Sequence, residues 1–99
     1  MRVILSREAI EDLVAIGEHI SEFNPGRAAS FLAELQIKCF ELSSAPFAYE
    51  RLVHRTNPEI RRRPYGNYLI FYRVIDSNID ILHVLHGAQN YMKILFPDD

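Results

Sequence analysis

The sequence has only one cysteine, no tryptophan, four glycines and no long apolar run. A single cysteine, Cys39, excludes an internal disulfide framework and fits a reducing compartment. No stretch approaches the roughly 18 to 20 apolar residues of a membrane-spanning helix. Charges at Arg2, Arg7 and Glu8 interrupt the start, where a signal peptide carries its apolar region. We therefore expect a cytoplasmic protein that does not engage a membrane.

The length and composition indicate one globular domain over residues 1–99. Hydrophobic residues make up 48% of the chain and charged residues 24%. This balance excludes an extended disordered chain, a collagen-like repeat and a coiled-coil rod. A chain of this length buries about two-thirds of its unfolded surface, which suffices for one modest core.

The net charge of −2 conceals an uneven distribution. Residues 1–50 carry a net charge of −4, residues 51–75 carry +5, and residues 76–99 carry −3. The central block contains Arg51, Arg55, Arg61, Arg62, Arg63 and Arg73 against Glu59. A nucleic-acid-binding domain is expected to be basic overall. One local basic block instead favours recognition of an acidic partner, and we expect no direct DNA binding by this chain alone.

Two helices are predicted in the first half of the chain. After the short apolar run Val3–Leu5, Ser6 is a suitable N-cap, and Asn24 with Pro25 closes one helix and opens the next. Each helix has an apolar stripe with spacings of four and three. The stripes comprise Ala9, Leu13, Ile16, Ile20 and Phe23, then Ala28, Leu32, Leu35, Cys39 and Leu42, with Phe31 and Phe40 widening the second. So short a break predicts an antiparallel helical hairpin.

Strand patterns dominate the second half. A loop over residues 46–59 precedes the strand at residues 60–63, and residues 64–67 read as a turn. Residues 68–75 and 79–86 alternate as two further strands around a turn at residues 76–78. Residues 88–96 are long enough for a short last helix. We expect an α+β, two-layer β-α-α-β-β-β domain, with the hairpin packed on a mainly antiparallel sheet.

The longest predicted strand is apolar on both faces. Tyr68, Ile70, Tyr72 and Val74 project to one face, while Leu69, Phe71, Arg73 and Ile75 project to the other. Two helices cover only one face. The second face is covered either by the loop at residues 46–59 and the C-terminal segment, or by a partner. The shortness of the chain favours the partner.

No pattern of residues indicates catalysis, a metal or a cofactor. His83 and His86 are three apart on a predicted strand and so point to opposite faces, while His19 and His54 lie elsewhere. Cys39 lies on the apolar helical stripe, where burial disfavours the reactive thiolate. No glycine-rich phosphate loop or nucleophile elbow is recognisable. We expect no catalytic residue, no metal and no cofactor.

The run Arg61–Arg63 has two interpretations. Arg61 and Arg63 share one face of a strand and Arg62 takes the other. In the structural interpretation, the charges protect an edge strand from pairing with another sheet. In the functional one, they recognise acidic groups of a partner or nucleic-acid phosphates, with Tyr65, Tyr68 and Tyr72 available for stacking.

The ordered set of segments resembles the ParE branch of the RelE/ParE toxin superfamily, whose members include plasmid stabilisation proteins. The matching segments are Ala9 with Asp12, Leu13 and Ile16; Asn24-Pro25 with Ala28, Ala29 and Phe31; residues 42–46; residues 60–62; residues 68–74; and residues 81–87. No single motif is highly specific, but the set covers nearly the whole chain. The Tyr-x-Ile-x-Tyr-Arg-Val strand followed by Val-Leu-His-Gly is the most telling part.

The resemblance implies a small bacterial toxin that causes growth arrest by inhibiting DNA gyrase and is held in a heterotetramer or larger complex by a ParD-like antitoxin. RelE-like relatives share the fold but cleave messenger RNA on the ribosome, using cations on the sheet and near the C-terminus together with a tyrosine. Here Leu69 stands where those nucleases have arginine, Ala88-Gln89-Asn90 follows Gly87 without a cation, and Lys93 is the only cation after Arg73.

This set is too poor for a nuclease, so we expect a binding protein and not an enzyme. The alternatives are a RelE-like endoribonuclease, with Tyr91 as its tyrosine, and a non-toxic relative that only binds antitoxin. The residues expected to contact antitoxin or target are Arg61, Arg62, Arg63, Tyr68, Tyr72, Arg73, His86, Gln89, Asn90 and Tyr91. The helical face expected to receive the antitoxin consists of Leu13, Ile16, Ile20, Phe31 and Leu35.

Overall fold

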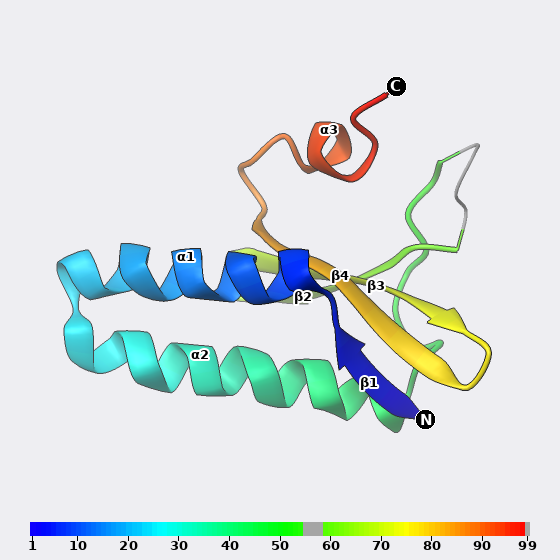
Figure 1. The fold of residues 1–99 in the computed structure, drawn as a ribbon, viewed down its shortest axis with the longest axis horizontal. Helices are drawn as coiled ribbons and strands as arrows, with labels where there is room; N and C mark the ends of the chain where they lie inside the picture. The colour runs from blue at the N-terminus through cyan, green and yellow to red at the C-terminus, as the bar shows by residue number, and fades with distance from the viewer. Residues whose placement is uncertain (55–58, 99) are drawn as a thin grey trace.

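The computed structural model describes residues 1–54 and 59–98, and its elements follow the expected order (Figure 1). They are β1 (Arg2–Leu5), α1 (Arg7–Phe23), α2 (Pro25–Phe40), the 3-10 helix η1 (Glu41–Ser43), β2 (Arg61–Tyr65), β3 (Tyr68–Ile75), β4 (Asn78–His86) and α3 (Tyr91–Leu95). The α+β fold class is therefore confirmed. None of the helices described is long and apolar enough to cross a bilayer.

Both helices of the hairpin begin where the sequence predicts. The Ser6 hydroxyl accepts a hydrogen bond from the Ala9 N–H at 3.0 Å and donates to the Leu82 carbonyl at 2.9 Å. The first bond caps α1, and the second fixes its start to β4. The Asn24 side chain caps α2 by accepting from the Arg27 N–H at 3.2 Å, with Pro25 in the first turn. The helices then run side by side (Figure 1).

The four strands form one sheet in the order β1-β4-β3-β2. Strand β1 is parallel to β4, whereas β2, β3 and β4 pair antiparallel. The β2–β3 turn is shorter than predicted, because Pro64 and Tyr65 belong to the strand and only Gly66 and Asn67 connect it. Gly66 has a φ of +57°, which glycine adopts without steric cost.

The first face of the sheet packs against α1 and α2. Tyr72, Ile70, Ile81 and Leu35 are fully buried in this core. Cys39 lies there too, and burial raises the pKa of its thiol to about 11, which keeps it protonated and inert as expected.

The second face of the sheet is covered by the chain itself. Leu52 and Ile60, from either end of the loop, pack with Phe71 and Leu85, and Tyr91, Leu95 and Phe96 close over them. Strand residues alternate between the two cores as predicted, since Ile70 and Tyr72 join the first and Leu69 and Phe71 the second. The intramolecular alternative is therefore correct. The argument that a short chain needs a partner on this face is wrong, because α3 and the loop provide the cover.

Candidate functional site

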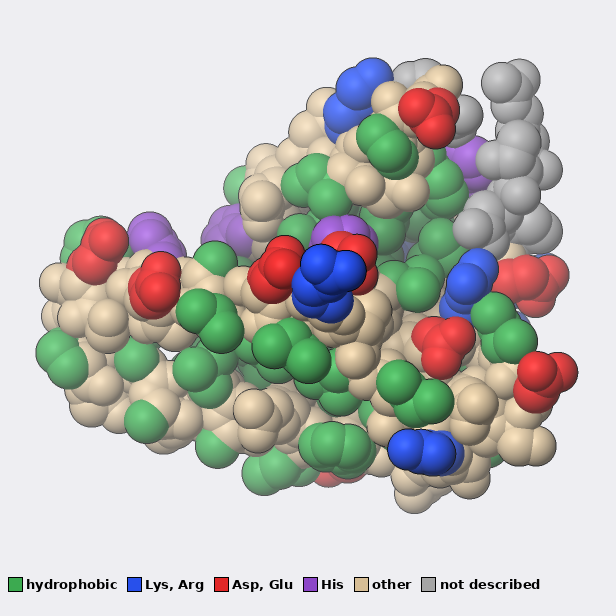
Figure 2. Space-filling view, in the orientation of Figure 1, with side chains coloured by type: hydrophobic (Ala, Val, Ile, Leu, Met, Phe, Trp, Pro, Cys, Tyr) green, Lys and Arg blue, Asp and Glu red, His purple; other side chains and the backbone are tan. Residues whose placement is uncertain are grey.

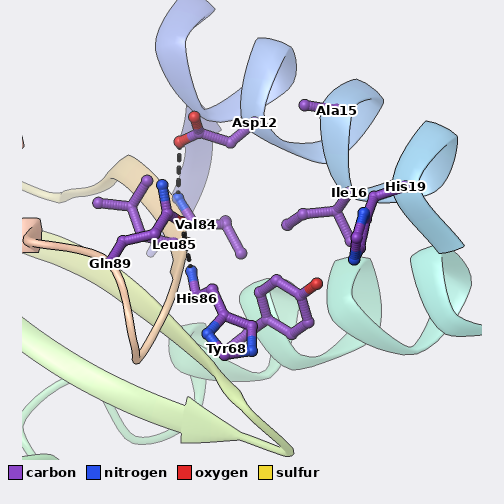
Figure 3. A pocket seen from close by; sticks show the side chains of 9 residues that line it. All are labelled: Asp12, Ala15, Ile16, His19, Tyr68, Val84, Leu85, His86 and Gln89. Carbon is purple, nitrogen blue, oxygen red and sulfur yellow. Dashed lines mark hydrogen bonds between the residues drawn. The ribbon is translucent and has the colours of Figure 1, made fainter.

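A hollow lies between α1 and the end of β4, and we call it the α1–β4 pocket (Figure 3). It is lined by Asp12, Ala15, Ile16 and His19 of α1, by Tyr68 at the start of β3, and by Val84, Leu85, His86 and Gln89. Three of the predicted contact residues, Tyr68, His86 and Gln89, meet here. In Figure 3 the Tyr68 ring extends from the strand toward Ile16 and His19. Burial raises the pKa of the Tyr68 hydroxyl.

Asp12 ties one wall of this pocket to the other. One oxygen, Oδ2, lies 2.8 Å from His83 Nδ1 and accepts from the Val84 N–H at 2.9 Å. Because a carboxylate only accepts, we assign a proton to Nδ1 of His83. The carboxylate thus serves to hold α1 on β4.

The end of β4 is folded back by a small set of polar contacts. The His86 N–H donates to the Gln89 side-chain oxygen at 2.8 Å, and the Ala88 N–H donates to His86 Nδ1 at 3.0 Å. The Tyr68 ring meets the His86 ring edge-on, with centroids 5.1 Å apart. His86 and Gln89 therefore shape the turn after Gly87, and Tyr68 packs against it.

The polar groups of the pocket are used within the fold or have no paired base among the described residues. Its carboxylate is already bonded to His83 and Val84, and no hydrogen bond joins the Tyr68 hydroxyl to a base within the described part of the chain. No group of three His, Cys, Asp or Glu side chains able to hold a metal occurs in residues 1–54 and 59–98.

Replacing Asp12 with alanine is expected to lower the free energy of unfolding by about 1–3 kcal/mol, because the buried Val84 N–H loses its acceptor. Hydrogen exchange at the Val84 amide is expected to accelerate more than that of its neighbours. Glu11→Ala, an exposed carboxylate one residue earlier, is the matched control and is expected to change neither quantity. Equal behaviour of the two variants would show that Asp12 does not fasten α1 to β4.

Two arginines of β2 hold the end of α2 and the segment that follows it. Arg61 donates to the Tyr49 carbonyl at 2.7 Å, and its guanidinium lies 5.2 Å from the centre of the Phe47 ring. Arg63 donates to the Lys38 carbonyl at 2.8 Å and to Glu41 at 3.0 Å. As predicted, both lie on the same face. Their hydrogen-bonding capacity is largely used within the fold.

Arg62 and Tyr91 meet on the opposite side of β2. The guanidinium donates to the Tyr91 hydroxyl at 3.1 Å and to the exposed carboxylate of Glu50 at 3.1 Å. The Tyr91 ring packs on Phe71 with centroids 5.2 Å apart. Tyr91 therefore anchors α3 to the sheet.

Strand β2 is an edge of the sheet, as the structural interpretation of the arginine run requires. Its outer side is partly occupied, because the Arg62 N–H donates to the Glu50 carbonyl and the Leu52 N–H to the Ile60 carbonyl. Pro64 lies two residues beyond Arg62, so its missing N–H falls on this outer side. A proline and charged side chains both discourage pairing with another sheet.

The remaining predicted contact residues lie apart. Tyr72 is fully buried and donates to the Pro46 carbonyl at 2.8 Å, so it is a core residue and cannot meet a partner. Asn90 is the N-cap of α3, Arg73 lies in a different hollow, and Arg55 of the basic block falls outside the described residues.

The helical stripe that we expected to receive an antitoxin faces inward. Leu13, Ile16 and Leu35 are 6%, 7% and 0% exposed, and Ile20 and Phe31 pack against the same core. Leu13, Ile16 and Leu35 therefore bind the hairpin to the sheet and are not accessible on its surface, whereas Ile20 and Phe31 are half-buried. The accessible apolar residues of the hairpin are Ile10, Val14, Phe23, Ile37 and Phe40. Figure 2 shows hydrophobic side chains over the hairpin and acidic ones along α1.

Sequence reasoning missed that Asp12 and His19 belong to the pocket. Their signal is present, because Asp12, Ala15 and His19 are spaced three and four apart and so share a helical face beside the apolar stripe. The sequence does not indicate which strand packs beside this helical face.

Solved structures with a similar fold come from toxin–antitoxin systems. A chain of the chromosomal ParDE system of P. aeruginosa has a TM-score of 0.75 and 22% identity, over 87% of this chain and 95% of that one. A chain of the RelBE2 complex of Mycobacterium tuberculosis has a TM-score of 0.65 and 24% identity over 86% and 95%. A chain of the RelB–RelE complex of Methanococcus jannaschii has a TM-score of 0.54 and 19% identity, over 95% of this chain and 99% of that one.

The sequence itself identifies the family of this protein. No curated protein sequence matches this chain significantly. The family model for the ParE toxin of the type II toxin–antitoxin system parDE matches residues 3–91, which is most of the chain. This protein therefore belongs to the ParE toxin family of type II toxin–antitoxin systems.

Proposed function

We propose that this toxin acts in the cytoplasm by binding a protein target, DNA gyrase, and that a ParD-like antitoxin neutralises it in a hetero-oligomer. The observation that carries the proposal is the family match over residues 3–91, combined with Leu69 and Ala88-Gln89-Asn90 at the positions where the resemblance places cations in the nucleases. The mode of action is binding and involves no bond cleavage.

The second sheet face supports a non-catalytic mode of action. Leu69, at the position where the resemblance places an arginine in the nucleases, packs with Phe71 and Leu95 in the second core. Ala88 is exposed and uncharged, and the Tyr91 hydroxyl is bonded to Arg62. Cleavage of RNA requires neutralisation of the phosphate together with acid–base help. Leu69 and Ala88 do not provide that charge, and Arg62 is already bonded to Tyr91 and Glu50.

The outer face of the hairpin supports protein binding. Ile10 and Val14 of α1 and Ile37 and Phe40 of α2 are each about half exposed. Apolar side chains on neighbouring helices form the kind of surface that an amphipathic helix covers. We assign this surface to the antitoxin helix in place of the buried stripe.

The test is induced expression in growing bacteria, with and without a co-expressed ParD-like antitoxin. We expect growth arrest from the toxin alone and full recovery with the antitoxin. Messenger RNA is expected to stay intact during the arrest, as measured by primer extension over highly translated transcripts.

Three results would contradict the proposal in different ways. Transcripts cut within codons during arrest would establish the RelE-like endoribonuclease alternative. No arrest at full expression, with antitoxin still bound, would establish the non-toxic relative. Arrest that the antitoxin does not relieve would refute the pairing.

A further inference from the structure

A second hollow lies where the start of α1 and the bulged part of β4 meet α3, and we call it the Arg73 pocket. Its polar side chains include Arg73 of β3, His83 of β4 and Glu8 of α1, and Leu82 and Leu95 form apolar walls. It is distinct from the α1–β4 pocket, with which it shares no lining residue. The family match assigns no role to it.

Arg73 differs from the three arginines of β2 because its guanidinium has no hydrogen-bond or ion-pair partner among the described residues. Its Nε is buried and has no hydrogen-bond partner within residues 1–54 and 59–98. The guanidinium makes no ion pair there either, although Asp80 stands opposite it on β4. By contrast, Arg61, Arg62 and Arg63 all bond to carbonyls or carboxylates. A buried donor without an acceptor is destabilising, so an acceptor from outside is favoured.

The surroundings select the kind of anion. A guanidinium binds a carboxylate through two parallel hydrogen bonds, which makes it a specific donor for that group. Glu8 at the same pocket opposes a second negative charge on the ligand, and so does Asp12, which is bonded to the neighbouring His83. A singly charged carboxylate is therefore a better fit than a doubly charged phosphate. The walls of Leu82 and Leu95 suit the methylene stem of an acidic side chain.

We propose that the Arg73 pocket receives the carboxylate of a glutamate or aspartate side chain of the antitoxin. The inference rests on the proposed function, since it takes the antitoxin as the partner. The Arg73 pocket would be a second anchoring point for the antitoxin, separate from the outer face of the hairpin. An antitoxin that reaches both surfaces wraps around the start of α1.

The first experiment measures the affinity of the full-length toxin for a purified ParD-like antitoxin by calorimetry. We expect Arg73→Gln to weaken binding about 30-fold or more, because truncating one member of a desolvated charge pair is costly. Arg2→Gln removes the same charge at an exposed position and is expected to stay within about threefold. Glu8→Gln is expected to strengthen binding by up to about fivefold, since it removes a competing charge.

A second measurement does not depend on any variant folding correctly. The Nε–H resonance of Arg73 is followed in wild-type protein, with the antitoxin and with N-acetylglutamine methylamide, the matching glutamate derivative and inorganic phosphate. We expect a downfield shift with the antitoxin and the glutamate derivative, and none with the neutral amide.

The outcomes separate this inference from the proposed function. Wild-type binding that survives Arg73→Gln unchanged, with an unshifted Nε–H signal, overturns the inference and leaves the function standing. A shift with phosphate alone overturns it in favour of a phosphate site. No binding of the antitoxin by the wild-type protein refutes both.

Discussion

Replacing Arg63 with alanine is expected to lower the free energy of unfolding by about 2 kcal/mol. The Arg63 side chain is only 13% exposed and bonds to the Lys38 carbonyl at the end of α2 and to Glu41. Its guanidinium also lies 5.1 Å from the centre of the Tyr49 ring. Hydrogen bonds that involve a charged group contribute about 1.5–3 kcal/mol. Chemical denaturation monitored by circular dichroism measures the loss.

The matched control is Arg62→Ala, on the next residue of the same strand. Its ion-pair partner Glu50 is 73% exposed, so the expected loss is below about 1 kcal/mol. Equal losses in both variants would contradict the view that Arg63 is a structural clamp. An unchanged stability of Arg63→Ala together with lost antitoxin binding would return the residue to the functional interpretation.

The Arg63 clamp also has a pH dependence. The hydrogen bond from Arg63 is the main cause that lowers the pKa of the Glu41 carboxyl from its ordinary 4.5. A lowered pKa in the folded state means that the contribution is present above 4.5 and is lost as the pH falls through the lowered value. The difference in stability between wild type and Arg63→Ala is therefore expected to narrow in acid.

Replacing Leu35 with alanine is expected to cost more, about 3 kcal/mol of the free energy of unfolding. Leu35 is completely buried where α2 meets the sheet. Removing its side chain leaves a cavity in the first core, and such leucine-to-alanine changes cost about 2–5 kcal/mol. Ile37→Ala on the same helix is the control. Ile37 is 55% exposed, and its loss is expected to stay below about 0.5 kcal/mol.

The Leu35 and Ile37 variants also distinguish residues of the core, which affect stability, from residues of an interface, which affect antitoxin binding. If the outer face of the hairpin receives the antitoxin, Ile37→Ala weakens antitoxin binding while leaving stability nearly unchanged. A weakened complex from Leu35→Ala alone, at full stability, would contradict the assignment of the buried stripe to the core.

Local signals in the sequence were sufficient for most of the fold. Ser6 and Asn24 each accept a hydrogen bond from the residue three positions ahead. The start of each helix is therefore determined by a few adjacent residues. Residues 68–72 alternate between the two cores because a strand has a period of two. Asp76, with a φ of +56°, marks the next turn as the polar run predicted.

The candidate site was only partly predictable, because it depends on which surfaces meet. The period of two of a strand predicts that Arg61 and Arg63 share one face. It does not predict that the end of α2 and the segment after it provide the acceptors for their hydrogen bonds. The same limit applies to Tyr72, which was predicted to contact a partner but is fully buried and donates its hydroxyl to the Pro46 carbonyl. The inward stripe of the hairpin was recognised as apolar, yet pattern alone does not distinguish a core from an interface. The cover of the second face likewise depends on Tyr91 and Phe96 folding back onto β3 and β4.

The most direct test of the central claim is DNA supercoiling by purified gyrase in the presence of purified toxin. The account predicts that the toxin inhibits supercoiling in proportion to its concentration and that excess ParD-like antitoxin restores the reaction. Supercoiling that proceeds at the normal rate with a large molar excess of folded toxin would contradict gyrase as the target.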